Sequence, residues 1–221
     1  MIKAVLFDLD GTLLDTLPDL TNIVNLTMRE LGYPERTLEE VRTFVGYGLV
    51  KLIERALPVG EPMTEDILAV AKENYLKFQN MYAVPYEGVP KLLSDLRALN
   101  IKTGIVSNKI NEAVQVILRE YFPDTMDVGI GTMQGVRIKP YPDQCLLAFE
   151  KLGAAPSECI YVGDGETDLE TAANAHMEAL GASWGYRGEE FLLAHGAKHI
   201  VHAPSEVLSY VLAHREDAPE G

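Results

Sequence analysis

The sequence predicts an α/β fold, with a doubly wound parallel sheet as its core and a helical cap inserted after the first strand. Two observations predict it. Short apolar runs, of the kind that are buried on both faces of a sheet, alternate with segments of helical periodicity over most of the chain. One stretch of about 65 residues, directly after the first apolar run, contains helical patterns alone.

Six apolar runs predict the strands of the core. They are residues 4–7, 103–106, 128–130, 160–162, 178–180 and 199–201. Each of the first four leads into polar or glycine-rich residues and then into a helical pattern, as between Val89 and Leu99. Strands that alternate with helices pair in parallel, so we expect right-handed crossovers between residues 103 and 162.

Residues 17–82 are predicted to form the helical cap domain, and residues 1–16 and 83–221 together form the α/β catalytic core domain. Pro18 suits the first turn of a helix whose apolar stripe stops at Gly32. The turn-rich sequence VPYEGVP at 84–90 marks the return to the core. In an open parallel sheet, ligands bind beyond the carboxyl ends of the strands. An insert that leaves the core at the carboxyl end of the first strand would therefore lie over any ligand site there.

Composition and charge restrict the class of protein. The 221 residues are 47% hydrophobic and 24% charged, and the formal net charge is −14. Nucleic acids and anionic membrane surfaces attract basic patches, so we expect neither as a partner. No secretory leader and no run of 18 apolar residues is visible, which predicts a soluble, cytoplasmic protein, either a monomer or a homodimer. Cys145 and Cys159 are expected as buried, reduced thiols, and residues 214–221 as a disordered tail.

Polar residues that are suited to catalysis follow four of the predicted strands. They are Asp8, Asp10, Gly11 and Thr12, then Ser107 and Asn108, then Lys139, and finally Asp164 and Asp168. Hydrolysis of a phosphate ester requires a hard cation, a nucleophile, a proton donor and positive groups for the phosphoryl oxygens, and this set supplies the protein's part. No His or Cys belongs to the set, so its oxygen ligands favour Mg²⁺ over zinc.

These four stretches resemble, in order, the four signature motifs of the haloacid dehalogenase superfamily in its phosphatase branch, whose core is Rossmann-like. They are DLDGTLLDT at 8–16, IVSNK at 105–109, KP at 139–140 and VGDGETD at 162–168. The position of the insert matches the helical cap of that family. Within the family, FVGYGLVKLIERAL at 44–57 and KPYPD at 139–143 are similar to phosphoglycolate phosphatases.

The resemblance implies a Mg²⁺-dependent phosphatase that acts on a small phosphorylated metabolite through an aspartyl-phosphate intermediate. The implied substrate is 2-phosphoglycolate. A pyrophosphatase, a sugar phosphatase or a β-phosphoglucomutase-type enzyme of the same superfamily remain alternatives. A non-catalytic binding domain is the alternative from another class of protein, and it would release no phosphate.

The resemblance also implies roles for the acids and for one lysine. Asp8 would be the nucleophile, and Asp10 would act as general acid to the leaving oxygen and then as general base to water. Asp8, Asp164 and the backbone carbonyl of Asp10 would bind Mg²⁺. Lys139 would stabilise both the phosphate and the Asp8 carboxylate. Asp168 would hold either a metal-bound water or Lys139.

The remaining implied contacts concern the phosphate and the cap. The phosphate would meet the backbone of Leu9, Asp10 and Gly11, with Thr12 supporting that loop, and it would also meet Ser107 and Asn108. In the cap, Gly46, Tyr47 and Gly48 precede a helix and would help to select the substrate. Two further readings stay open at this point. Glu166 is either a water-mediated metal contact or a solvated side chain, and Arg187 is a candidate contact for an anionic substrate.

Overall fold

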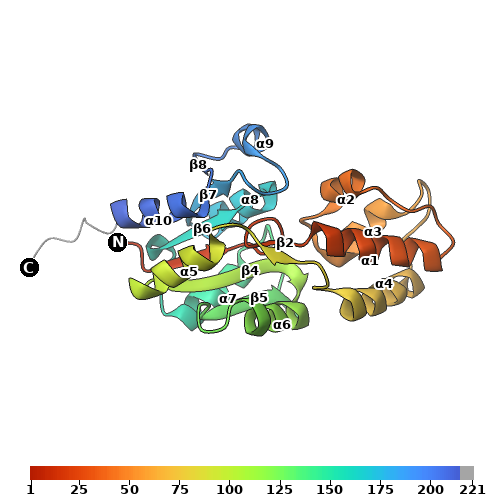
Figure 1. Cartoon of the computed structure of the whole chain (residues 1–221), viewed down its shortest axis with the longest axis horizontal. Helices are drawn as coiled ribbons and strands as arrows, with labels where there is room; N and C mark the ends of the chain where they lie inside the picture. The colour runs from red at the N-terminus through yellow and green to blue at the C-terminus, as the bar shows by residue number, and fades with distance from the viewer. Residues whose placement is uncertain (215–221) are drawn as a thin grey trace, which may run out of the picture.

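A computed structural model describes residues 1–214, so most of the predicted tail lies outside the described residues. Its centre is a six-stranded sheet in the order β5-β4-β1-β6-β7-β8, and every neighbouring pair is parallel. The strands are β1 (Ala4–Phe7), β4 (Lys102–Ile110), β5 (Val128–Thr132), β6 (Cys159–Gly163), β7 (Glu178–Ala182) and β8 (His199–Val201). The predicted fold class is therefore confirmed (Figure 1).

Helices cover both faces of this sheet. They are α5 (Val89–Ala98), α6 (Asn111–Tyr121), α7 (Asp143–Leu152), α8 (Glu166–Asn174), α9 (Glu189–Ala194) and α10 (Pro204–Ala213), with a 3-10 turn at Pro156–Glu158. Successive side chains of β1 point to opposite faces. Val5 and Phe7 join the apolar cluster that includes α5, α6 and α10, whereas Ala4 and Leu6 join the cluster that includes α7 and α8. No helix within residues 1–214 is long and apolar enough to cross a membrane.

In the chain, four helices come between the first strand and the rest of the core. In space they are grouped together beyond one end of the sheet (Figure 1). They are α1 (Leu17–Glu30), α2 (Leu38–Phe44), α3 (Gly48–Ala56) and α4 (Glu65–Phe78). Their buried apolar residues form a cluster of their own, to which the core contributes Ala113 and the partly buried Ile110 and Tyr186. We refer to these helices and their loops as the cap; its exact boundaries at residues 17 and 82 remain a prediction.

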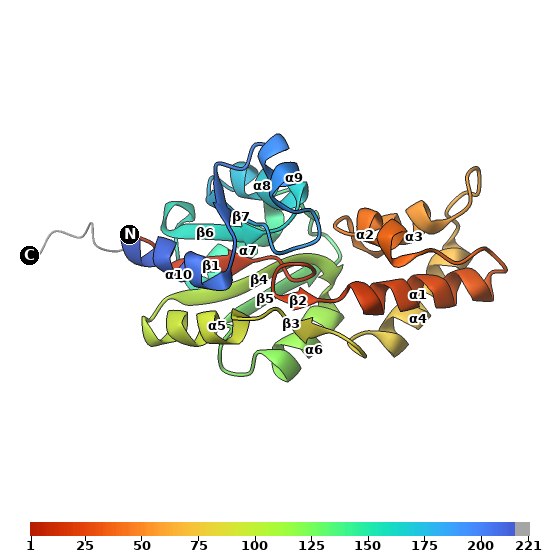
Figure 2. The same ribbon diagram turned by 45° about the horizontal axis from the view of Figure 1, so that its top comes forward.

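The chain enters and leaves the cap through a short antiparallel ribbon. It consists of β2 (Leu14–Asp15) and β3 (Val84–Pro85), which lie side by side at the border of the cap (Figure 2). Asp19, in the first turn of α1, strengthens this junction. Its buried Oδ1 accepts hydrogen bonds from the backbone N–H groups of Met81 and Tyr82, at 2.8 and 3.0 Å. The first turn of the cap is thus tied directly to the returning chain.

Candidate active site

The predicted site residues meet at the carboxyl edge of the sheet, beneath the cap. Asp8 directly follows β1, which is paired with β4 on one side and with β6 on the other. Asp164 follows β6, and Lys139 lies in the loop between β5 and α7. Ser107 was expected after its strand, but it lies within β4, which continues to Ile110 past an irregularity in its pairing with β5. The sheet therefore places residues from four separate stretches at one edge.

Lys139 connects two carboxylates in the interior of the protein. Its Nζ lies 2.8 Å from Asp8 Oδ1 and 2.6 Å from Asp168 Oδ1, and it donates to the hydroxyl of Tyr161 at 3.2 Å. The side chain of Lys139 is 1% exposed. Burial by itself lowers the pKa of Lys139, but Asp168 and Asp8 outweigh burial and hold this pKa above its ordinary value. Lys139 is thus a fixed positive charge beside the candidate nucleophile.

Asp164 is held in place by the loop that follows β1 and by the loop that follows β7. Its Oδ1 accepts from Thr12 Oγ1 at 3.0 Å, and its Oδ2 accepts from the backbone N–H of Tyr186 at 2.8 Å. A Cβ on Gly11 would lie 2.5 Å from Asp164 Oδ2, and one on Gly185 would lie 2.2 Å from the Asp164 Cβ. The Thr12 hydroxyl therefore holds the Asp164 carboxylate. Gly11 and Gly185 approach Asp164 so closely that neither position has room for a Cβ.

Three buried carboxylates form the candidate metal centre. Asp8, Asp164 and Asp168 each offer an oxygen atom, and these atoms lie within 4.8 Å of one another. Asp168 is already engaged through both oxygens, because Oδ1 binds Lys139 and Oδ2 accepts from the Gly165 N–H at 2.9 Å. Asp8 Oδ1 is buried beside Lys139 without the geometry of a hydrogen bond. Asp164 also accepts a hydrogen bond at each oxygen, but its donors are a hydroxyl and a backbone N–H, whereas Asp168 is paired with the ammonium group of Lys139. Asp8 and Asp164 are therefore the candidate metal ligands, and all their donor atoms are oxygens, which fits Mg²⁺.

The electrostatics of these two acids call for additional positive charge. With protein groups alone, burial raises the pKa of Asp8 to about 7, although Lys139 opposes the shift. Burial, together with Asp168 and Asp8, raises the pKa of Asp164 to about 8. Both carboxyls are therefore substantially protonated at neutral pH unless a cation neutralises them. A divalent ion at this position would restore both carboxylates.

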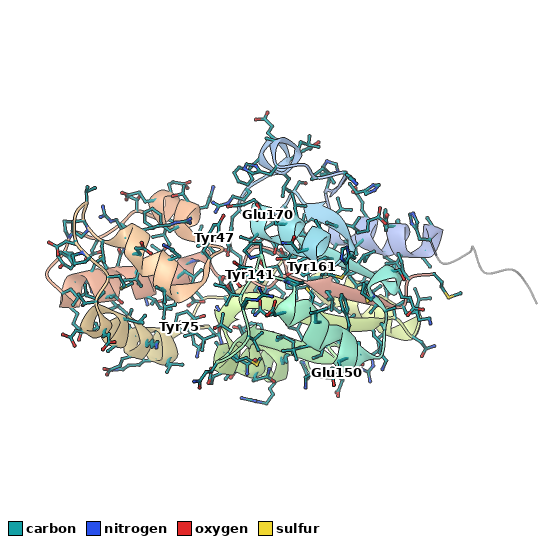
Figure 3. The ribbon with its side chains drawn as sticks, turned by 180° about the vertical axis from the view of Figure 1, so that it is seen from behind. Tyr47, Tyr75, Tyr141, Glu150, Tyr161 and Glu170 are labelled. Carbon is teal, nitrogen blue, oxygen red and sulfur yellow. The ribbon has the colours of Figure 1, made fainter. Side chains whose placement is uncertain are left out.

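Asp10 lies apart from this cluster and turns toward the cap. Its Oδ1 accepts from Thr16 Oγ1 at 2.7 Å and from Lys109 Nζ at 3.0 Å. Lys109 is buried, and its Nζ also lies 5.2 Å from the centre of the Tyr75 ring, on helix α4 of the cap. In Figure 3, Tyr75 is seen at the border between cap and core. The second acid of the first motif therefore has its own positively charged partner.

Asn108 fixes the relative positions of three segments. Its side-chain amide donates to the backbone carbonyls of Gly46 and Lys139, at 2.9 and 3.1 Å, and its Oδ1 accepts from the Lys139 N–H at 2.8 Å. Ser107 Oγ accepts a long hydrogen bond of 3.3 Å from the Lys109 N–H. The side chain of Asn108 is thus structural, and the implied phosphate contact of this residue rests on its backbone N–H alone.

A small cavity joins the acids to the cap. Asp8, Asp10 and Ser107 line one end, and Gly46 and Gly48 line the cap side together with apolar side chains. Its volume of about 40 Å³ is a few times the roughly 10–15 Å³ that one water needs on the same measure. The cavity therefore offers a small space between the acids and the cap.

Tyr47, between the two cap glycines, has a different function from theirs. The Tyr47 hydroxyl donates to Glu166 Oε1 at 2.9 Å and so links the cap to the start of α8. Figure 3 shows Tyr47 at the border between cap and core. Arg187 also belongs to this link. It lies 3.6 Å from Glu166 Oε2, and it donates to the carbonyls of Arg42 and Val45 at 3.0 Å each. Glu166 is therefore not a solvated side chain, and Arg187 binds cap carbonyls at the end of α2.

The comparison with protein families agrees with this geometry. The model of the haloacid dehalogenase-like hydrolases matches residues 5–182, which is most of the chain and includes the four stretches that supply the site. The chain belongs to this family. The resemblance drawn from the four motifs is therefore confirmed, and the protein is a hydrolase of the haloacid dehalogenase type.

Among curated members of the haloacid dehalogenase family, a phosphoglycolate phosphatase from Xanthomonas campestris is 34% identical over 208 residues, covering 93% of this chain and 94% of the relative. One from Aquifex aeolicus is 32% identical and covers 84% of this chain and 86% of the relative. An N-acetylmuramic acid 6-phosphate phosphatase from Pseudomonas aeruginosa is also 32% identical, with coverage of 94% and 93%. Relatives at this level of identity thus carry two different substrate names.

Solved structures give the same family. A provisionally assigned phosphoglycolate phosphatase from Lactobacillus delbrueckii superimposes with a TM-score of 0.87 at 33% identity, covering 95% of this chain and 98% of that one. A predicted phosphoglycolate phosphatase from Haemophilus somnus gives a TM-score of 0.86 at 26% identity, with coverage of 95% and 98%. The agreement extends over the cap as well as the core, because nearly the whole of each chain is covered.

Lys109 and Thr16 are two residues at the site that the sequence analysis did not single out. Both contact Asp10, and both stand in stretches that were quoted as motifs. Lys109 directly follows Ser107 and Asn108 and is the last residue of the stretch quoted for the second haloacid dehalogenase motif, so this position was an available signal. A lysine in a polar stretch is usually a surface residue, which is why the burial of Lys109 was not anticipated.

Proposed function

We propose that this protein is a Mg²⁺-dependent phosphatase that hydrolyses a small phosphomonoester, with 2-phosphoglycolate as the preferred substrate. One observation carries the proposal. A buried carboxylate, Asp8, faces a small cavity beside a fixed positive charge, Lys139, and a second acid, Asp10, lines the same cavity. The names of the relatives in Xanthomonas and Aquifex support the choice of substrate.

Mg²⁺ would be held by the carboxylates of Asp8 and Asp164 and by the backbone carbonyl of Asp10. The bound ion would neutralise the phosphoryl oxygens and allow Asp8 to remain ionised. Asp168 would act indirectly, because its charge is paired with Lys139 at 2.6 Å, whereas Asp164 accepts from neutral groups, the Thr12 hydroxyl and the Tyr186 N–H. This division of labour follows from the hydrogen bonds of each acid.

In the first step, an oxygen of Asp8 would attack phosphorus while the bond between phosphorus and the ester oxygen breaks. A carboxylate is a weak nucleophile, so it reacts well only when it is held in line and the phosphate charge is neutralised. The contact with Lys139 and the burial of Asp8 provide that fixed orientation. The product of this step is an aspartyl-phosphate on Asp8.

Asp10 would supply the proton for the leaving oxygen, since it lines the cavity that receives the leaving group. In the second step it would remove a proton from water, which attacks phosphorus and releases phosphate from Asp8. The Thr16 hydroxyl and Lys109 fix the position of this carboxyl through its Oδ1. The other oxygen of Asp10 would then face the ester.

The phosphoryl oxygens would contact Lys139, the Ser107 hydroxyl and the backbone N–H groups of Leu9, Asp10 and Asn108. Gly11, with a φ of +88°, turns the backbone in a way that L-residues rarely adopt. On the cap side, Gly46 and Gly48 would limit the size of the leaving group, since both line the small cavity. Tyr47 would act on selection only indirectly, through the position of the cap.

Two measurements test the proposal. A panel of phosphate esters, ranked by kcat/KM with Mg²⁺, should place 2-phosphoglycolate first; it should include a sugar phosphate, N-acetylmuramic acid 6-phosphate and pyrophosphate. A far better sugar phosphate or pyrophosphate would refute the assigned substrate. Formation of an isomer instead of free phosphate would indicate a mutase.

The Asp8→Asn variant tests the nucleophile. An amide cannot form the acyl phosphate, so we expect phosphate release to fall by at least about 10³-fold. Wild-type turnover in this variant would remove Asp8 from its proposed role. The Lys91→Met variant is the control, because Lys91 is 78% exposed and pairs only with its helix neighbour Asp95.

A further inference from the structure

Lys109 is a buried cation whose charge the proposed chemistry does not use directly. Its side chain is 2% exposed, although lysine is among the residues least often buried. The Asp10 carboxylate, whose Oδ1 lies 3.0 Å from Lys109 Nζ, provides a partner of opposite charge at this buried position. Lys109 is therefore a permanent positive charge inside the protein.

The ammonium group of Lys109 retains a donor that no protein group uses. An ammonium carries three N–H donors. Asp10 Oδ1 accepts one at 3.0 Å, and the Tyr75 ring lies with its centroid 5.2 Å from the same nitrogen. Both partners and Lys109 itself line the cavity. A third donor is thus available to whatever occupies the cavity.

The rest of the leaving-group end of the cavity is apolar. It is lined by Leu20, Val45, Leu49, Leu52 and Ile110. Lys109 is the one positively charged side chain among the described residues that line this space. In such surroundings an anionic group gains strongly from a single nearby cation, and without that cation it would be costly to bury.

Other cations near the cavity are already engaged. Lys139 is shared between Asp8 and Asp168, and in the proposed reaction it serves the phosphoryl group. Arg187 donates to two carbonyls of the cap, and Arg55 donates to the carbonyl of Phe44 at 3.1 Å. Lys109 is therefore the side chain best placed to meet a charge on the leaving group.

We propose that Lys109 binds the carboxylate of the leaving group and thereby selects phosphate esters of short hydroxy acids. The inference rests on the proposed phosphatase function. A general acid must approach the ester oxygen to within about 3 Å, and Lys109 Nζ lies 3.0 Å from Asp10 Oδ1. In a two-carbon hydroxy acid the carboxyl carbon is separated from the ester oxygen by one methylene group. The same ammonium can therefore reach both Asp10 and that carboxylate.

The test compares two esters of the same length, of which one carries this carboxylate and the other does not. One is 2-phosphoglycolate, and the other is 2-hydroxyethyl phosphate, in which a hydroxymethyl group replaces the carboxylate. For the wild-type enzyme with Mg²⁺, kcat/KM should favour the acid by roughly 10- to 100-fold, as expected for a hydrogen bond to a charged group. In Lys109→Met this preference should disappear, whereas Lys109→Arg should retain part of it and Lys91→Met should retain all of it.

Each outcome separates the inference from the proposed function. Loss of Asp10 positioning alone would lower kcat/KM for both esters by the same factor, so an unchanged ratio in Lys109→Met refutes the carboxylate contact. A wild-type enzyme that hydrolyses both esters equally also refutes it, while leaving the phosphatase intact; this measurement requires no variant to fold. If the wild-type enzyme releases phosphate from no member of the ester panel, the proposed function itself is wrong.

Discussion

Replacing Lys139 by methionine isolates the contribution of one buried charge. Methionine keeps an unbranched side chain of similar length but removes the ammonium that lies 2.8 Å from Asp8 and 2.6 Å from Asp168. Both carboxyls would remain buried with no positive partner in the protein. Breaking a buried ion pair in this way costs about 3–5 kcal/mol of unfolding free energy. We expect Lys139→Met to lose that amount at pH 7.5, and to lose phosphatase activity with it.

The matched control is Lys3→Met on the protein surface. Lys3 Nζ lies 2.6 Å from Glu158, the same distance as in the buried pair, but the Lys3 side chain is 56% exposed. Exposed pairs contribute about 0–1 kcal/mol, so burial and not distance should separate the two variants.

Urea unfolding at pH 7.5 and at pH 5, without divalent metal, measures both variants. At pH 5 the Asp8 carboxyl, whose pKa burial raises to about 7, is protonated with or without Lys139, so the deficit of Lys139→Met should shrink. A Lys139→Met variant that is no less stable than Lys3→Met, or whose deficit does not depend on pH, would refute the argument.

Two further predictions concern the acids and the turn between them. Without divalent metal, the pKa values of Asp8 and Asp164 are about 7 and about 8 in the folded protein, against 3.8 in the unfolded chain. The folded state therefore binds more protons than the unfolded state between these values, so the free energy of unfolding should fall as pH rises from 4 to 8. Mg²⁺ should therefore raise Tm more at pH 8 than at pH 5; an equal rise at both values contradicts this. Gly11 and Gly32 both have a positive φ, but only at Gly11 would an added Cβ lie 2.5 Å from Asp164. Gly11→Ala should therefore destabilise the protein more than Gly32→Ala does, and it should also abolish turnover. Gly32→Ala should cost only the backbone strain of about 1–2 kcal/mol, and equal unfolding free energies would refute the steric argument.

The positions of the core strands could be predicted because buried parallel strands are continuous apolar runs in the sequence. All six were placed, and the helical stretch after the first was identified. The exceptions have physical causes. The polar residues 107–109 look like a loop, yet β4 continues through them because its pairing with β5 resumes at Ile110, opposite Thr132. The strands β2 and β3 have two residues each, too few for any period to be visible.

The candidate site was predictable where acids stand at strand ends, and less so where it depends on tertiary contacts. Lysine carries no mark in the sequence that separates a buried residue from a surface one, so Lys109 was missed. The roles of Glu166 and Arg187 could not be predicted either, because their partners lie in the cap, more than 100 positions away in the chain. The roles of Asp8 and Asp10 remain predictions that the proposed variants and substrates test.

The ribbon of β2 and β3 also bears on how such a protein diversifies. Leu14 pairs with Pro85 and Asp15 pairs with Val84, so the chain leaves the core and returns to it at adjacent points. The whole cap is therefore joined to the acids through two neighbouring peptide junctions. A recombination event that exchanged the segment between them would replace the selecting surface and leave the reacting groups in place. Substrate range and chemistry can thus be inherited separately in this architecture.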